Sequence, residues 1–373
     1  MHFVRRNPPV IAVVSAMLAL SACGGGQDDS SPQVVEQQKA LAGWTVPTCS
    51  HITGTNAITF TRDEGATLAS TGTLTGTVYT PGLVALDTAN TLLAVHANSV
   101  IRSTDAGCTW SSIGTVPAGL TLTAAAGGRA YAWAENGSGL YRIEGTTITA
   151  LTSPVANILG LGVDAANGSH VRVGDRRGQL YESFNGGASW KALGVAPASG
   201  DFVLGYSVAF DPANLNHVLF GLASQGAFVS TNGGSTWKQV KGLSTGRANG
   251  FTIAVSPANG QIVWLAGLDL ETSIRKLYRS ADGGQNFAPV VEESETVTLG
   301  NGPLVAPHPK DAHVIYFEFG TYFQDYGTDI YKYDHATGVV TQTHNANDGV
   351  SSIAFSPADP SVMYFGLTSI IPS

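Results

Sequence analysis

The sequence predicts an all-β protein built from a repeated unit of about 50 residues. Composition is the first observation: of 373 residues 45 are Gly and only 12% are charged, whereas an average domain has about 7% Gly and roughly 25% charged residues. The second and third observations are two motifs that recur along the chain. A hydrophobic content of 43% excludes a disordered chain, and three Cys are too few for a disulfide scaffold.

The first motif reads S/T-x-D/N-x-G-x-x-aromatic or apolar. Clear copies begin at Ser103, Ser183, Ser230 and Ser280, and a weaker copy begins at Thr61. In this pattern Asp or Asn caps its own turn, Gly takes the left-handed position, and the aromatic ring lies back over the hairpin. We assign these structural roles to Asp63, Asp105, Trp110, Asn185, Trp190, Asn232, Trp237, Asp282 and Phe287.

The second motif is a strand, a turn and a second strand, anchored at Pro212, Pro257, Pro307 and Pro357. These prolines are spaced by 45, 50 and 50 residues, and the serines at 183, 230 and 280 by 47 and 50. Alternating apolar residues flanked by turn residues are typical of half-buried strands. Two motifs with one period predict repeated units of four strands, and we expect the abundant Gly to fall in their hairpins.

The first motif resembles the Asp-box, or BNR repeat, of sialidases, xyloglucan-active glucanases, sortilin-like receptors and photosystem assembly factors. This resemblance implies a β-propeller with one domain at residues 44–373. Motif spacing predicts seven blades, with six or eight as the alternatives. Residues 353–366 form an inner strand pair that lacks outer strands, and residues 57–75 an outer pair that lacks inner strands. We expect the two pairs to share a blade and close the ring, which removes exposed sheet edges.

The N-terminus predicts export. Residues 1–22 have a basic start and an apolar stretch from Val10 to Leu20 that is too short to span a bilayer. Leu20-Ser-Ala-Cys23 resembles the bacterial lipoprotein signal, which implies cleavage before Cys23 and its acylation, with palmitate as a typical chain. Residues 23–43 would be the lipidated Cys and a flexible tether. Gly24 favours the outer membrane of the cell envelope; an ordinary secreted protein is the alternative.

With Cys23 acylated, Cys49 and Cys108 remain as an even pair in an oxidising compartment, and we expect a disulfide between them; two unpaired thiols are the alternative. Neither Cys-x-x-Cys nor His-Glu-x-x-His occurs, so we expect no metal and no cofactor. The net charge of −8, with 19 basic and 27 acidic residues, argues against a nucleic-acid partner. We expect a monomer that meets the membrane through its lipid.

In a propeller, ligands usually bind on the face opposite the repeat turns. One loop on that face, Gly320 to Asp329, is aromatic and acidic, which suits stacking on a sugar or gripping a peptide. A loop that packs on itself is the alternative. We place on the ligand face Glu135, Arg176, Arg177, Asp201, Arg247, Asn249, Glu271, Glu295, Asn301, Tyr322, Asp325, Tyr326, His344, Asn347 and Asp348.

A complete catalytic set is not recognisable. Similarity to sialidases would imply three converging arginines and a Tyr–Glu nucleophile, but no Phe-Arg-Ile-Pro-like segment introduces the first arginine. Similarity to xyloglucanases would imply two Asp, for which Asp201 and Asp348 are only weak candidates. We therefore expect a non-catalytic propeller that presents its channel face to a protein or glycan. A glycoside hydrolase is the alternative.

Overall fold

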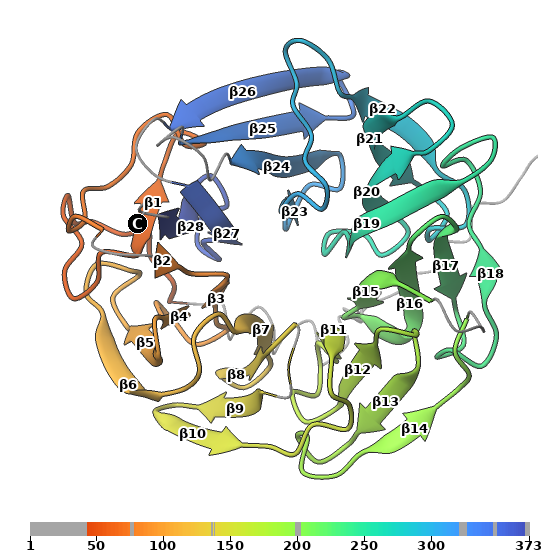
Figure 1. Ribbon diagram of the computed structural model, residues 1–373. Coiled ribbons are helices and arrows are strands. Elements are labelled where there is room, and N and C mark those ends of the chain that lie inside the picture. The colour runs from red at the N-terminus through yellow and green to blue at the C-terminus, as the bar shows by residue number, and fades with distance from the viewer. Residues whose placement is uncertain are drawn as a thin grey trace, which may run out of the picture.

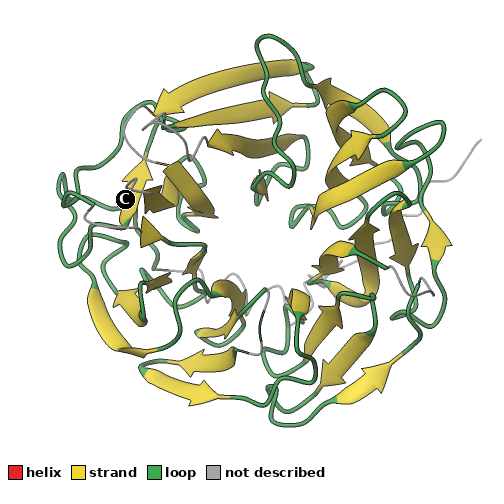
Figure 2. Cartoon of the chain, in the orientation of Figure 1, coloured by secondary structure: helices red, strands yellow, loops and turns green. Residues whose placement is uncertain are grey.

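The described part of the chain is a ring of antiparallel sheets (Figure 1). The computed structural model describes residues 43–74, 78–135, 137, 139–197, 203–320, 327–345 and 349–369. Strands and loops make up these residues, and no helix occurs among them (Figure 2). Accordingly, none of them forms a helix long and apolar enough to cross a membrane.

The strands follow one another sheet by sheet. The first units are β3 (Gly82–Ala85), β4 (Leu92–His96), β5 (Ser99–Ser103) and β6 (Ser111–Thr115); β7 (Thr121–Ala125), β8 (Arg129–Trp133), β9 (Leu140–Glu144) and β10 (Thr147–Ala150); and β11 (Ile158–Val163), β12 (Val171–Asp175), β13 (Leu180–Ser183) and β14 (Lys191–Leu193). Next come β15 (Gly205–Asp211), β16 (Asn214–Leu222), β17 (Gly226–Ser230) and β18 (Lys238–Gln239); β19 (Ala248–Val255), β20 (Val263–Asp269), β21 (Ile274–Ser280) and β22 (Ala288–Glu292); and β23 (Val305–Pro307), β24 (Val314–Gly320), β25 (Thr328–Asp334) and β26 (Val339–Asn345). The last unit combines β27 (Gly349–Phe355) and β28 (Met363–Ser369) with β1 (Ile58–Thr61) and β2 (Val78–Tyr79).

Each unit runs outward from an inner strand near the axis of the ring (Figure 1). Five sheets have four strands, and one sheet has eight, β15 to β22. The eight-stranded sheet is two antiparallel units joined by a single parallel bridge between Gly226 and Asn249. When the eight-stranded sheet is divided at this bridge, the described strands form seven groups of four. The all-β propeller class is confirmed, and this grouping supports the count of seven blades, which stays a prediction.

Strands from the two ends of the chain share one sheet, as the sequence predicts. β28 pairs with β27 on one edge and with β1 and β2 on the other, where Ile58 faces Gly366 and Val78 faces Ser369. The expected hairpin at 57–75 differs in detail. Only residues 58–61 are a strand there, because the following backbone turns away at Ser70 to bridge His51.

The core lies between adjacent sheets rather than inside any one of them. In the closing sheet, Phe60 and Tyr364 meet edge to face at 6.2 Å and pack with Leu92 and Trp110 of the next sheet. Burying these apolar surfaces holds neighbouring sheets together.

Close approach of sheets also explains part of the glycine excess. A Cβ on Gly160 of β11 would lie 1.9 Å from the carbonyl oxygen of Val208 on β15. A Cβ on Gly162, also of β11, would lie 2.4 Å from Cβ of Phe210 on β15. The expectation that Gly falls in hairpins was therefore incomplete, because inner strands of neighbouring sheets also need residues without side chains.

A disulfide joins Cys49 to Cys108, with the Cα atoms 5.8 Å apart. The segment before β1 lies against the repeat turn that follows β5. Backbone N–H groups of Thr53 and Trp110 donate to the carbonyls of Cys108 and Thr53, each at 3.0 Å. The covalent bond thus fastens the segment that precedes the closing sheet onto the sheet β3–β6.

Candidate functional site

The five repeat turns share one hydrogen-bond pattern. In the turn after β5, Oγ of Ser103 donates to Oδ1 of Asp105 at 2.8 Å and accepts from the N–H of Gly107 at 2.9 Å. Oδ1 of Asp105 also accepts from the N–H of Thr109 at 2.9 Å. Burial raises the pKa of Asp105, but hydrogen bonds from Thr109 and Ser103 outweigh it, and the net pKa is lowered. The same bonds recur in the turns that begin at Thr61, Ser183, Ser230 and Ser280.

Because the side-chain oxygens of the capping residues accept hydrogen bonds within their own turns, these residues have a structural role. The aromatic residues support them differently. Nε1 of Trp110 donates to the carbonyl of Gly107 in its own turn at 3.0 Å, whereas Nε1 of Trp237 donates to the carbonyl of Val195 at 2.8 Å, after the outer strand of the previous unit.

The weakest copy of the motif has an additional contact. Glu64 adopts a left-handed φ of 59°, at the position where three of the other turns carry Gly. Its Oε1 accepts from the hydroxyl of Tyr316 at 3.1 Å and from Nζ of Lys332. Both partners belong to the neighbouring unit β23–β26. Sequence reasoning missed this contact, and the charged residue in a Gly position was the available signal.

The loops that lead into the inner strands, and the loops between second and third strands, share one side of the ring, which we call the axial face. Arg247 and Glu271 meet there: the N–H of Arg247 donates to Oε1 of Glu271 at 3.0 Å, and Nε lies 3.8 Å from the same oxygen. Their side chains are 69% and 44% exposed. The structure thus brings together two of the candidate residues in a solvent-facing pair.

Other residues of the axial face also have hydrogen-bond partners. Arg275 donates to Asn301 at 2.8 Å and to Glu293 at 3.1 Å. The backbone N–H of Arg177 donates to Asp175 within its loop. Asn249 accepts from the N–H of Ser224, and His344 lies 2.7 Å from Asp329 on the outer strands. Three arginines converging on one point, as a sialidase would need, are not found among the residues described here.

Four groups from different units influence one another electrostatically on this face. Burial raises the pKa of Glu135, and Arg176 opposes that rise. Burial also raises the pKa of Tyr79, and the carboxylates of Glu135 and Glu318 raise it further. Tyr79 is 50% exposed although it is a large aromatic residue. Sequence reasoning missed it because it follows no repeat motif.

Several candidates lie outside the described residues. These are Cys23, Asp201, Tyr322, Asp325, Tyr326, Asn347 and Asp348. Glu295 is described, in the loop between β22 and β23.

The seven inner strands, all of them described, carry one carboxylate between them. That residue is Asp211, at the end of β15. Its Oδ2 lies 3.3 Å from Nδ1 of His217, whose Nε2 lies 2.8 Å from the carbonyl oxygen of Gly283. Both Asp211 and His217 are buried. Within the described ranges, no group of three or more His, Cys, Asp or Glu side chains could hold a metal ion.

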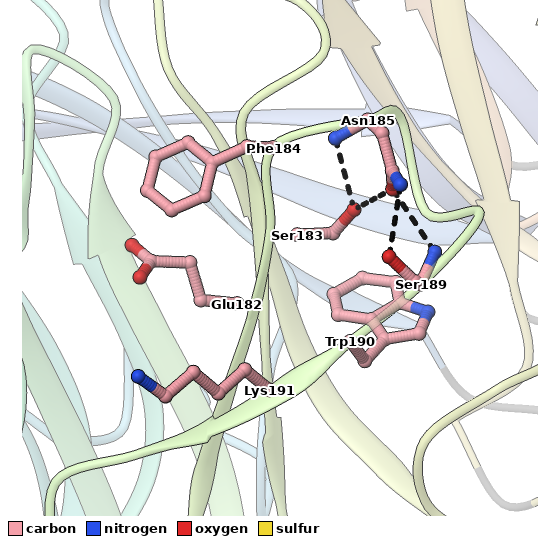
Figure 3. A pocket seen from close by; sticks show the side chains of 7 residues that line it. All are labelled: Glu182, Ser183, Phe184, Asn185, Ser189, Trp190 and Lys191. Carbon is pink, nitrogen blue, oxygen red and sulfur yellow. Dashed lines mark hydrogen bonds between the residues drawn. The ribbon is translucent and has the colours of Figure 1, made fainter.

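A small hollow of about 250 Å³ lies at the repeat turn after β13, away from the axial face (Figure 3). Phe184 projects there with 67% of its surface exposed. The corresponding positions of the other turns hold Arg62, Thr104, Thr231 and Ala281. Sequence reasoning missed Phe184, although an aromatic residue at a position where the other four turns have none was a signal that could have identified it. The lining residues are Glu182, Ser183, Phe184, Asn185, Ser189, Trp190 and Lys191.

Comparison with known proteins identifies the family. The chain is 50% identical over 371 residues to the dispase autolysis-inducing protein of Streptomyces mobaraensis, and the match covers 96% of each chain. The chain belongs to the family of that protein. No protein-family model matches it.

Solved structures similar to this member of the family are propellers. The Niastella koreensis GH74 enzyme matches with a TM-score of 0.58 and 17% identity over 79% of this chain, which spans 52% of the enzyme. YCF48 from Cyanidioschyzon merolae gives a TM-score of 0.55 and 14% identity, covering 84% of this chain and 96% of YCF48. Virginiamycin B lyase from Staphylococcus aureus gives 0.53 and 14%, covering 79% and 96%. At such identities the likeness concerns the fold.

Proposed function

We propose that this chain is a non-catalytic propeller that binds a secreted proteolytic enzyme through its axial face and promotes the self-digestion of that enzyme. One observation carries the proposal: the 50% identity, along 96% of both chains, to a Streptomyces protein named for inducing the autolysis of dispase. Autolysis is the digestion of a protease by molecules of the same protease, so the proposed partner is a protease.

The axial face suits a protein partner. Two ion pairs, the exposed Arg247–Glu271 and the half-buried Arg275–Glu293, present both signs of charge on this face. Such groups steer a partner into position more than they add affinity. Tyr79, on β2 of the closing sheet, supplies an exposed aromatic surface on the same face, and tyrosines often contribute much of the binding free energy at an interface.

The chemistry of the inner strands supports a role without hydrolysis. A glycoside hydrolase needs two carboxyl groups about 5 to 10 Å apart, with at least one free to act. Asp211, the one carboxylate of these strands, already faces His217 in a buried pair. Likeness to the GH74 enzyme concerns the fold at 17% identity. Release of reducing sugar from xyloglucan or of sialic acid from sialosides would overturn this part of the proposal.

We also propose that Cys23 anchors the chain to the outer membrane of the cell envelope through a lipid. The Leu-Ser-Ala-Cys sequence and Gly24 support this address. The test is detergent-phase partition of the expressed protein, with the mass of its N-terminal peptide. A Cys23→Ser variant that partitions like the parent, or a peptide mass without lipid, would contradict it.

The activity test uses dispase and the purified chain without residues 1–23. We expect the half-life of intact dispase, followed by gel densitometry, to fall when the chain is added at equimolar concentration. Tyr79→Ala should weaken the effect roughly tenfold if the tyrosine contributes about 1.4 kcal/mol to binding. Lys238→Ala on the outer strand β18 is the control and should not change it. An unchanged half-life with the parent chain would overturn the proposal.

A further inference from the structure

We propose that the open face of Phe184 is a subsite for a hexose unit of a glycan. One face of the phenyl ring stacks on the imidazole of His170, with centroids 4.4 Å apart and planes inclined by 16°. With 67% of the residue exposed, the opposite face meets solvent. Exposed rings in this state rarely contribute to folding, because burial is what makes an aromatic side chain stabilising.

A chain of polar and charged groups holds the platform in place. Nδ1 of His170 lies 3.2 Å from Asp164, and Nε2 lies 2.9 Å from Oε1 of Glu182. Nη2 of the buried Arg172 lies 2.6 Å from the same oxygen of Glu182, and Nη1 donates to the carbonyl of Leu215 in the next unit. Both nitrogens of His170 are therefore engaged, which fixes the plane of its ring and of the ring stacked on it. Such preorganisation lowers the entropic cost of binding.

The groups beside the platform match a sugar. In Figure 3, Glu182 and Lys191 extend on the same side of the hairpin as Phe184, and the two are directly paired residues of β13 and β14. A hexose has an apolar C–H face that packs on an aromatic ring, and hydroxyls at its edge that accept from an ammonium and donate to a carboxylate. Lys191 provides the ammonium at the edge of the platform. The Glu182 side chain is 13% exposed and its Oε1 is engaged by His170 and Arg172, so its part is to hold the platform.

Other ligand classes fit less well. Cationic groups bind over aromatic rings, but here Lys191 extends on the same side of the hairpin as the ring, and its ammonium would repel a second cation. Apolar side chains would need an apolar wall. Five of the seven lining residues are polar, and only Phe184 and Trp190 are aromatic.

The subsite is independent of the proposed protease contact. It lies on a turn between third and fourth strands, at the end of the sheets opposite the axial face. It is also specific to this unit. In the next unit, the counterpart of His170 is His217, which is buried against Gly283, and the counterpart of Phe184 is Thr231.

The test is a calorimetric titration of the full chain with cellohexaose, maltohexaose, mannohexaose and N-acetylchitohexaose. We expect one of these probes to bind, and Phe184→Thr, which copies the neighbouring turn, to weaken binding at least tenfold. Phe184→Tyr should restore it, and Thr231→Ala, the matched position in the next unit, should bind like the parent. The dispase assay should be unaffected by Phe184→Thr.

Three results would overturn the proposal. One is the absence of binding of all four probes to the parent chain up to about 10 mM, near the limit of useful affinity for one sugar site. Another is equal binding by Phe184→Thr and the parent. The third is equal loss in Phe184→Tyr and Phe184→Thr, because a role of the ring as a stacking surface requires that an aromatic replacement retain it. Unfolding temperatures of all variants verify that each is folded.

Discussion

Removal of the disulfide tests how the segment before β1 is held. The perturbation is the double variant Cys49→Ala and Cys108→Ala. These residues are separated by 59 positions, so their bond closes a long loop in the unfolded chain. Opening a loop of this size should lower the free energy of unfolding by about 4 kcal/mol through the entropy that the unfolded chain regains.

The folded state should survive this change. Backbone bonds between Thr53 and the turn at Cys108 and Trp110 do not involve sulfur, and Nε1 of Trp44 still donates to the carbonyl of Leu86. We therefore expect a native near-ultraviolet circular dichroism spectrum. For a ring of this size, 4 kcal/mol corresponds to a fall in the melting temperature of about 6 °C.

The assay is thermal unfolding of the parent and the double variant, each with and without dithiothreitol. Reductant should lower the melting temperature of the parent to that of the variant and leave the variant unchanged. Ser50→Ala is the control for alteration of the segment itself. A loss below about 1 kcal/mol would refute the reasoning, because it would mean that the unfolded chain gains little freedom when this loop opens.

Three further predictions follow from single contacts. Gly160→Ala should cost about 3 kcal/mol in urea unfolding, because the added methyl group meets a backbone carbonyl that cannot move aside; Gly300→Ala, with its nearest atom 3.9 Å away, is the control and should cost little. Burial lowers the pKa of His217, but bonds with Asp211 and a carbonyl outweigh it and raise the pKa above its ordinary value. The folded state thus binds this proton more tightly, so its stabilisation is full below about pH 6.5 and lost as pH rises through the raised pKa; His217→Gln should abolish this part of the pH profile, and an unchanged profile would contradict the assignment. Ser230→Ala should cost about 1 to 3 kcal/mol, because a buried N–H loses its acceptor, and a cost below a few tenths would show that the turn re-forms without the hydroxyl.

The sequence predicted those features that depend on local chemistry. Each turn is made by residues within seven positions, so Ser, Asp or Asn and Gly at fixed spacing are enough to identify it. Sheet order then followed from the period. Contacts between units were not accessible in the same way. Glu64 meets Tyr316 across 252 residues, and this pairing depends on the twist and spacing of whole sheets.

The same limit applies to the candidate sites. Arg247 and Glu271 were placed on one face from topology alone, and the structure joins them. Phe184 and His170 are close in sequence, but their stacking depends on two carboxylates and an arginine that arrive from three strands or loops. Spacing predicts which strand a residue occupies; it does not predict which rotamer its neighbours impose.

Repetition itself separates structural from functional residues in this ring. Positions that make the turn are constrained in all five copies, so they carry little information about function. Several residues at variable positions of the turns are large or make specific contacts, among them Arg62, Glu64, Cys108 and Phe184. Arg62 donates to the carbonyl of Pro47, and Cys108 is bonded to Cys49. Glu64 contacts Tyr316 and Lys332 of the adjacent unit, and ring closure accounts for it. Phe184 rests on His170 with most of its surface in water, so folding alone does not account for it, and binding is the remaining physical reason for an ordered, exposed ring.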